Sequence, residues 1–291
     1  MSQQFFAILA ERGVIRITGE DAREFLQGLI SNDINRVSPG QAIYAALLTP
    51  QGKYMFDFFV AEHDGALLLE TERSRIAELI KRLNMYKLRA KADLQDVSDA
   101  WRVAAVWGEG SLEGFGLPGE PGATIARANG LAFTDPRLLD AGARLLLRSS
   151  DPLPEATDAG AEGYDDHRLA LGLPDGSRDM ILDKSILLES GFDELHGVDW
   201  NKGCYMGQEL TARTKYRGLV KKRLVPVSID GPLPASGTDV TADGKTVGEV
   251  RSGLGGKALA LIRLEALENK TAAMRAGDAT VTPHRPPWAE F

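Results

Sequence analysis

Residues 200–218 read WNKGCYMGQELTARTKYRG, and they contain the only cysteine of the chain, Cys204. Gly203 and Gly207 flank this cysteine, and glycine can adopt positive φ or let another backbone or a ligand approach closely. Residues 208–216 are mostly good helix formers, and a glycine, a common helix stop, follows soon after them. We therefore expect Cys204 in a shaped loop directly before the N-terminus of a helix.

This position leaves two roles open for the cysteine. A thiol beside Lys202 and near a helix N-terminus experiences positive potential, which favours the thiolate, the nucleophilic and metal-binding form. The alternative is a buried cysteine that acts as a small apolar side chain. Packing alone requires neither the two glycines nor the lysine, so the sequence keeps the reactive role in consideration.

A family resemblance starts from the same residues. KGCYMGQE at 202–209 matches the K-G-C-Y-x-G-Q-E signature of the YgfZ family, and the chain resembles a bacterial member. This family comprises folate-binding proteins related to the T protein of the glycine cleavage system, and it includes the mitochondrial factor for iron-sulfur cluster assembly. Further similar segments are residues 212–213 and 216–218 after the motif, 12–15, 25–28 and 32–33 near the start, and 247–250 and 259–263 near the end.

Composition places the chain among ordinary globular proteins, with 291 residues of which 43% are hydrophobic and 26% charged. No apolar run approaches the roughly 20 residues that span a membrane. Residues 1–10 lack the basic start and apolar core of a signal peptide. One cysteine forbids an internal disulfide, which agrees with a reducing compartment. We therefore expect a cytoplasmic protein with no membrane partner.

The charge balance bears on the partners. With 34 basic and 41 acidic residues the net charge is -7, which argues against a nucleic-acid partner. A local exception follows the cysteine motif, where six cations occur within eleven residues: Arg213, Lys215, Arg217, Lys221, Lys222 and Arg223. These side chains form either a solvated helix face and strand start, or an anion site for the glutamate tail of a folate or for an acidic or RNA partner.

The pattern of elements predicts an α+β fold. Strands are expected at residues 12–19, 42–48, 54–62, 66–70 and 101–107, and helices at 20–30, after Ser74 and at 164–171. Five short strand-like segments near the end suggest a small antiparallel barrel. The resemblance implies a T-protein-like folate-binding fold of mixed antiparallel sheets and helices with a small C-terminal β-barrel. We divide the chain into a folate-binding region, 1–223, with room for two interleaved subdomains, and a barrel domain, 224–291.

Two carboxylates are candidates for folate chemistry. Asp57 interrupts an apolar strand on the face opposite Phe56 and Phe58, so it faces either solvent or a cavity. Glu189 follows two leucines and precedes a glycine, as a helix-end residue in water would. The T protein has an aspartate for folate chemistry at or next to the position of Asp57, and a glutamate that holds the pterin ring in a similar Leu-Glu-x-Gly. A carboxylate can accept two parallel hydrogen bonds from a pterin.

The remaining assignments concern cofactor and metal. Besides Asp57 and Glu189, we assign cofactor binding to four residues in and after the motif: Tyr205, Gln208, Arg213 and Arg217. The cofactor that the resemblance implies is tetrahydrofolate or a one-carbon derivative. The four histidines are not spaced as metal ligands, so no metal site is predicted. One cysteine cannot hold an iron-sulfur cluster, which typically takes four thiolates. A protein that handles clusters would therefore share ligation with a partner or another subunit, or act on the process without holding the cluster.

Three hypotheses remain. The first is a tetrahydrofolate-binding accessory factor for assembly or repair of iron-sulfur proteins, with client or assembly proteins as partners. In it Cys204 is the reactive or ligating thiol and Lys202 tunes it. The second is a tetrahydrofolate-dependent aminomethyl or one-carbon transferase that uses Asp57 and Glu189. The third is a folate-dependent scaffold without thiol chemistry. The sequence leaves open whether the protein is an enzyme.

Overall fold

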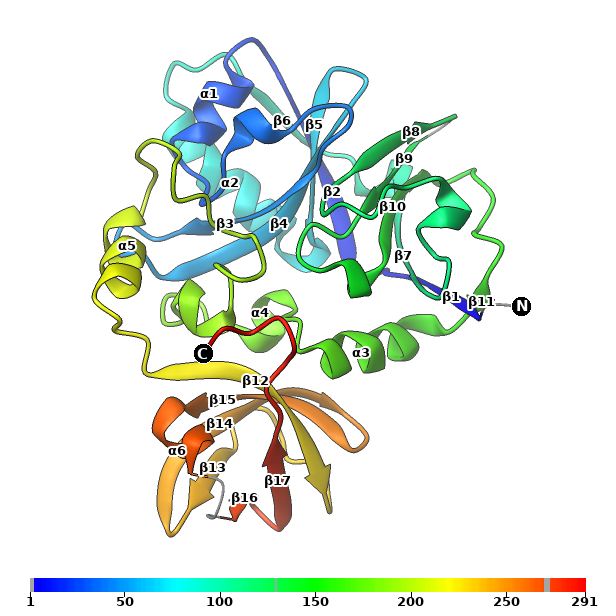
Figure 1. The fold of residues 1–291 in the computed structure, drawn as a ribbon. Coiled ribbons are helices and arrows are strands. Elements are labelled where there is room, and N and C mark those ends of the chain that lie inside the picture. The colour runs from blue at the N-terminus through cyan, green and yellow to red at the C-terminus, as the bar shows by residue number, and fades with distance from the viewer. Residues whose placement is uncertain (1–2, 129, 270–272) are drawn as a thin grey trace. The chain divides into compact units, whose positions relative to one another are not determined.

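The computed structural model describes residues 3–128, 130–269 and 273–291 (Figure 1). Contacts divide these residues into two compact units. The first comprises the described residues of Met1–Pro50, Met55–Tyr164 and Leu195–Met206, and the second those of Gln51–Tyr54, Asp165–Glu194 and Gly207–Phe291. The chain passes between the units several times, and the division after residue 223 stays a prediction.

The first unit contains a five-stranded sheet with helices on one face. The strands are, in order, β3 (Ile43–Leu48), β4 (Tyr54–His63), β5 (Ala66–Glu72), β2 (Arg12–Thr18) and β6 (Asp93–Asp96). Side chains alternate between the two faces, because successive residues of a strand point to opposite sides. Phe56, Phe58 and Val60 of β4 pack in one core with α1 (Ala22–Gln27) and α2 (Ile76–Lys87).

The other face of that sheet meets a second sheet of the same unit. This sheet has six strands in the order β11 (Thr157–Asp158), β1 (Gln4–Ile8), β7 (Trp101–Gly108), β10 (Ala143–Arg148), β9 (Gly130–Thr134) and β8 (Thr124–Arg127). Phe59 of β4 lies 6.0 Å from Phe133 of β9 between ring centroids. Phe59 points opposite to Phe58, so the alternation of β4 supplies both the helix-facing core and the contact between the sheets.

The second unit contains a closed six-stranded barrel. Its strands are β12 (Lys222–Asp230), β15 (Lys257–Arg263), β14 (Lys245–Leu254), β13 (Asp239–Ala242), β16 (Met274–Ala276) and β17 (Ala279–Pro283). The helical elements are the end of α3 (Gly160–Leu171), α4 (Gly176–Asp179), η6 (Leu187–Ser190), α5 (Gln208–Tyr216) and α6 (Leu264–Glu268). Buried Arg168 of α3 donates to Asp179 of α4 at 2.7 Å and to Ser252 of β14 at 2.6 Å. This network joins helices and barrel within the unit.

Several predicted elements differ in detail from the structure. The barrel has a sixth strand, β16, which is only three residues long and too short for an alternation signal. The helix expected at 20–30 is shorter, because α1 ends at Gln27. The predicted cap at Ser74 is wrong: a 3-10 turn, Arg73–Arg75, precedes α2, and the Ser74 hydroxyl donates to Glu72 instead. In the described part of the chain, no helix has the length and apolar character needed to cross a membrane.

Candidate functional site

Cys204 lies in a loop that several backbone contacts hold in the first unit. The Asp199 carboxylate accepts hydrogen bonds from the backbone N–H of Asn201 at 2.7 Å and of Lys202 at 3.0 Å. On the other side of the cysteine, the N–H of Met206 donates to the carbonyl of Gly28 at 3.1 Å. Cys204 itself is exposed. The alternative of a buried, packing cysteine is therefore wrong, and the thiol is accessible to a reagent or a partner.

Lys202 is the buried tether of this loop. Its ammonium donates to the carbonyls of Ile30 and Asn32, both at 2.7 Å, and lies 5.2 Å from the centre of the Tyr205 ring. Burial lowers the pKa of Lys202 to about 8, although Asp33 and Asp199 oppose this shift. The two carbonyl bonds connect the cysteine loop to a segment far away in sequence. The tuning of Cys204 by Lys202 stays a prediction.

The two glycines of the motif play different parts. Gly207 has a φ of 82° at the start of α5, a conformation that favours glycine, as the sequence suggested. Gly203 is not among the residues with positive φ, and an added Cβ would meet no atom within 4 Å. Gly203 therefore does not use the positive-φ conformation, and close approach of a ligand at this position stays a prediction. The helix expected at 208–216 is present as α5.

Asp57 lies between the two sheets of the first unit. Its side chain is buried, so the solvent-facing alternative is wrong. The hydroxyl of Tyr44, a fully buried residue of β3, donates to the Asp57 carboxylate at 2.9 Å. Burial first, and the charge of Asp57 second, raise the pKa of Tyr44 well above its usual value. The phenol therefore stays protonated and donates, and Asp57 serves as the acceptor.

Asp57 and Tyr44 belong to a larger buried group that we call the polar seam. Its members are Arg12, Tyr44, Asp57, Glu70, Asp135, Arg137 and Arg144. Glu70 of β5 accepts from Arg12 and from Arg144 of β10, both at 2.7 Å, which joins the two sheets. Burial acts to raise the pKa of Asp135, but Arg137 and Arg144 outweigh it and lower the pKa.

Sequence reasoning missed the rest of the polar seam. The available signal was the presence of single charges, Glu70 and Arg144, inside apolar strand segments. Such a charge is rarely buried unless it is paired. The residues lie 74 positions apart in sequence, so the pair could not be found from spacing.

Glu189 lies in η6 of the second unit and is half-buried. Burial raises its pKa, and the positive charges of Lys222, Lys53 and Arg223 oppose that shift. The carboxylate thus lies partly out of water with cations around it. A group in this position can accept two hydrogen bonds from a planar ligand, and the cations can receive an anionic part of the same ligand.

The four other residues predicted to bind the cofactor differ in their exposure to solvent. Tyr205 is buried beneath the Lys202 ammonium, whereas Arg213 and Arg217 are exposed. Arg213 forms an ion pair with Glu209 one turn earlier on α5, and Gln208 is the first residue of that helix. Roles for these four residues in cofactor binding stay predictions.

One member of the six-cation cluster is not a surface charge. Arg223 is buried and donates to the carbonyl of Leu188 at 2.6 Å and to the carboxylate of Glu194 at 2.7 Å. It therefore supports η6, the turn that carries Glu189, instead of facing solvent as the solvated interpretation required.

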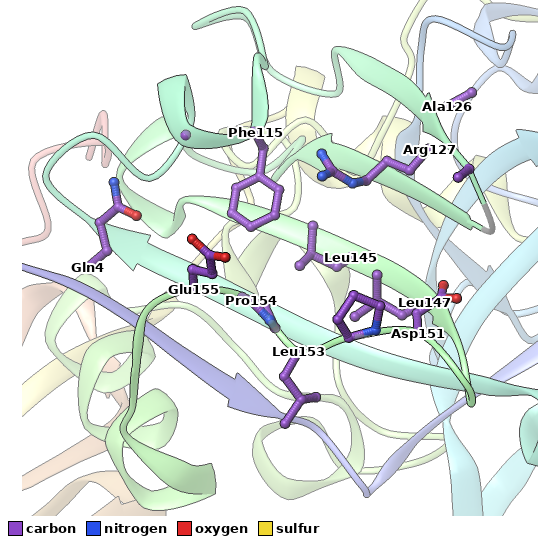
Figure 2. A pocket seen from close by; sticks show the side chains of 13 residues that line it. Gln4, Phe115, Ala126, Arg127, Leu145, Leu147, Asp151, Leu153, Pro154 and Glu155 are labelled. Atoms are coloured by element: carbon purple, nitrogen blue, oxygen red, sulfur yellow. The ribbon is translucent and has the colours of Figure 1, made fainter.

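A cavity of about 690 Å³ lies elsewhere in the first unit (Figure 2). Figure 2 shows Phe115, Leu145 and Pro154 around it, and none of the residues predicted from the sequence lines it. Its one cation, Arg127, lies 5.1 Å above the Phe115 ring, while Asp151 and Glu155 bring the opposite charge. The lining therefore selects no single class of ligand. Among the residues that the structure describes, no group of three or more His, Cys, Asp or Glu could hold a metal ion.

Comparison with known proteins identifies the fold. The model of the GCVT N-terminal domain matches residues 9–113, and that of the CAF17 C-terminal beta-barrel domain matches residues 221–291. The crystal structure of glycine cleavage system aminomethyltransferase T from Bartonella henselae superposes with a TM-score of 0.78 at 16% identity, over 99% of this chain and 87% of that one. The predicted α+β T-protein-like fold with a C-terminal β-barrel is confirmed.

Curated relatives extend over most of the chain. Iron-sulfur cluster assembly factor IBA57, mitochondrial, is 34% identical in Mus musculus and 35% in Homo sapiens; each match covers 88% of this chain and 77% of the relative. The homologue of Aspergillus clavatus is 32% identical, with 90% and 71% covered.

These names contradict the expected cytoplasmic location, because the relatives are mitochondrial proteins. The expectation failed because a single cysteine suits any reducing compartment and does not distinguish the cytoplasm from the others. Sequence identities of 32–35% over 71–77% of each relative are sufficient to assign the chain to a family. The chain belongs to the family of the iron-sulfur cluster assembly factor IBA57, with an aminomethyltransferase-like fold.

Proposed function

We propose that this protein is a tetrahydrofolate-binding accessory factor in the assembly or repair of iron-sulfur proteins, and that Cys204 is its reactive or ligating thiol. The observation that carries the proposal is the exposure of this sole cysteine on a loop held by buried Lys202. A cysteine that only packed would be buried. The names of the relatives, iron-sulfur cluster assembly factors, support the same role.

The cluster is cargo in this proposal, not a resident group. With one cysteine the chain supplies at most one thiolate, and a cluster typically takes four. The other ligands must come from a client or assembly protein. Exposure of Cys204 is what such sharing requires, because the partner must reach the same iron.

Glu189 is the proposed anchor of the folate. Its half-buried carboxylate can accept hydrogen bonds from the amino group and ring N–H of a pterin, and Lys53 and Lys222 place positive charge nearby. One hydrogen-bond acceptor with two cations nearby fits a ligand that combines a planar hydrogen-bonding ring with an anionic tail. Gln208, Arg213 and Arg217 are proposed as further contacts, together with Tyr205. The motif KGCYMGQE also supports a finer placement beside the folate-binding YgfZ proteins.

Binding of 5-formyltetrahydrofolate, followed by isothermal titration calorimetry, tests the folate anchor. Glu189→Gln removes the ionised acceptor and should weaken binding by about tenfold or more, because hydrogen bonds to charged groups contribute about 1.5–3 kcal/mol. The exposed Glu113→Gln is the matched control and should bind like the wild type. Equal binding by wild type and Glu189→Gln would exclude Glu189 as the anchor.

A second candidate function, tetrahydrofolate-dependent aminomethyl or one-carbon transfer, is favoured by one observation. Asp57 is a buried carboxylate fixed by the Tyr44 hydroxyl, as expected of a residue that positions a reacting amine. Release of methylenetetrahydrofolate from an aminomethylated donor, lost in Asp57→Asn, would support this function. If no methylenetetrahydrofolate forms while the protein still binds folate, this second function is excluded and Cys204 remains the proposed functional residue.

A further inference from the structure

The C-terminal half of α2 and the residues after it concentrate unpaired positive charge. Residues 81–91 contain five cations in a chain of net charge -7: Lys81, Arg82, Lys87, Arg89 and Lys91. Lys91 pairs with Glu20. Within the described ranges, the other four make no side-chain hydrogen bond or ion pair. Arg23 of the same unit, in contrast, is paired with Glu62. The four cations therefore remain available to an outside group.

Two large apolar side chains lie among these cations. Met85 is 60% exposed and Leu88 is 89% exposed. Leu88 ends α2 with a φ of 48°, a conformation that residues other than glycine seldom adopt. A single exposed leucine needs no explanation, but apolar side chains grouped within a basic segment indicate an interaction surface. We call Lys81, Arg82, Met85, Lys87, Leu88 and Arg89 the basic apolar surface.

A groove lies directly beside this surface. It has a volume of about 440 Å³, and apolar side chains from both helices, Phe25 and Leu29 on the α1 side and Tyr86 on α2, line it with Leu88. Figure 1 shows α1 and α2 together in the first unit. The groove can receive one large apolar side chain of a partner while the surrounding cations contact its polar neighbours.

We propose that the basic apolar surface docks an acidic, amphipathic segment of a partner protein. Its apolar side chains cover Met85 and Leu88 and enter the groove, and its carboxylates pair with the four unpaired cations. Charge complementarity supports this occupant, because positive charge concentrated on an acidic protein steers an acidic partner to that place. The proposal goes beyond folate and thiol chemistry, because it requires neither Glu189 nor Cys204.

An anionic membrane fits the same surface less well. Asp21 and Glu24 line the groove and would face lipid phosphates of the same sign. The net charge of -7 also opposes approach to an anionic bilayer. A protein segment can place its carboxylates beside the four unpaired cations and keep them away from Asp21 and Glu24.

The test places the photo-crosslinker p-benzoylphenylalanine at position 88 of the full chain in cells, and maps the crosslinked residues by mass spectrometry. We expect a protein adduct on a segment that contains both acidic and apolar residues. The double variant Lys87→Glu/Arg89→Glu should reduce the adduct about tenfold, because reversal of two charges changes the local charge by four units at a complementary contact. Reversal of the mapped partner carboxylates to lysine should restore it.

Controls separate this result from general charge effects. A crosslinker at Leu233, 42% exposed in the other unit, and the exposed pair Lys184→Glu/Lys245→Glu should not reproduce the adduct or its loss. If the charge-reversed protein melts at a lower temperature, Lys87→Gln/Arg89→Gln replaces it. The proposal is overturned if no protein adduct forms, or if the adduct persists after charge reversal. It is also overturned if Lys87 and Arg89 instead govern binding to phosphatidylcholine vesicles containing phosphatidylglycerol.

Discussion

Replacement of Lys202 by methionine tests whether this residue holds the cysteine loop. Methionine keeps an unbranched stem against Tyr205 but removes the donor to the carbonyls of Ile30 and Asn32. Two hydrogen bonds from a charged donor contribute about 1.5–3 kcal/mol each, so about 3–6 kcal/mol is lost. Burial lowers the pKa of Lys202 from 10.5 to about 8, which means that the buried charge costs about 3 kcal/mol at neutral pH. Removal of the charge recovers that cost.

The net expectation is that Lys202→Met lowers the free energy of unfolding by up to about 3 kcal/mol at pH 7. Urea unfolding followed by circular dichroism measures this difference. Lys245→Met, at an exposed lysine of the barrel, is the matched control and should change stability by less than about 0.5 kcal/mol.

The pH dependence of Lys202 gives a second, independent test. The folded protein releases the Lys202 proton at about pH 8, whereas an unfolded lysine keeps it up to about pH 10.4. Between these values the unfolded state binds more protons, so this group raises stability as pH rises. The neutral amine still has hydrogens for both carbonyls, and the difference between wild type and Lys202→Met should therefore widen above pH 8.

A Lys202→Met variant more stable than the wild type at pH 7, or a stability difference that narrows above pH 8, would refute the role of Lys202 in holding the loop. The rate of Cys204 alkylation as a function of pH, measured in the same variants, tests the predicted tuning of the thiol separately. Slower alkylation of Lys202→Met at neutral pH would show that the ammonium favours the thiolate.

Three further predictions concern other buried or half-buried groups. Folate binding should weaken as pH falls from neutral, because protonation of Glu189 removes the hydrogen-bond acceptor. Burial raises the pKa of Glu189, so this weakening should begin at a higher pH than for an ordinary glutamate. Calorimetry with Glu189→Gln should show weaker binding without this pH dependence. Tyr44→Phe removes the buried hydroxyl that donates to Asp57 and should cost about 1–3 kcal/mol in urea unfolding. Asp179→Asn leaves Arg168 incompletely paired and should cost about 3–5 kcal/mol, visible as a lower melting temperature, whereas preserved stability would mean that water replaces the carboxylate.

Local patterns were sufficient for much of the fold. The alternation of β4 predicted both the strand and the opposite orientation of Asp57 and Phe58, and the helix formers after Gly207 predicted α5 with its bounds. These features depend on neighbouring residues only. β16 was missed because three residues carry too little alternation.

Contacts between distant residues could not be predicted. Asp57 has the same alternation whether or not a second sheet covers it, so its burial depended on packing that one strand does not reveal. Lys202 finds its carbonyl partners 170 and 172 residues away. Arg223 lies in a charged run of the sequence, but its side chain is buried because it donates to Glu194 and to the carbonyl of Leu188.

We propose that the exposed thiol of Cys204 performs the function. The most direct test is the activity of an enzyme with a four-iron cluster in cells that lack this protein, after complementation with wild type or Cys204→Ala at equal expression. We predict that the variant fails to restore activity while its melting temperature matches the wild type, since an exposed side chain contributes little to stability. Full restoration by Cys204→Ala would exclude a functional role for the thiol and direct attention to Asp57, Glu189 and the folate site.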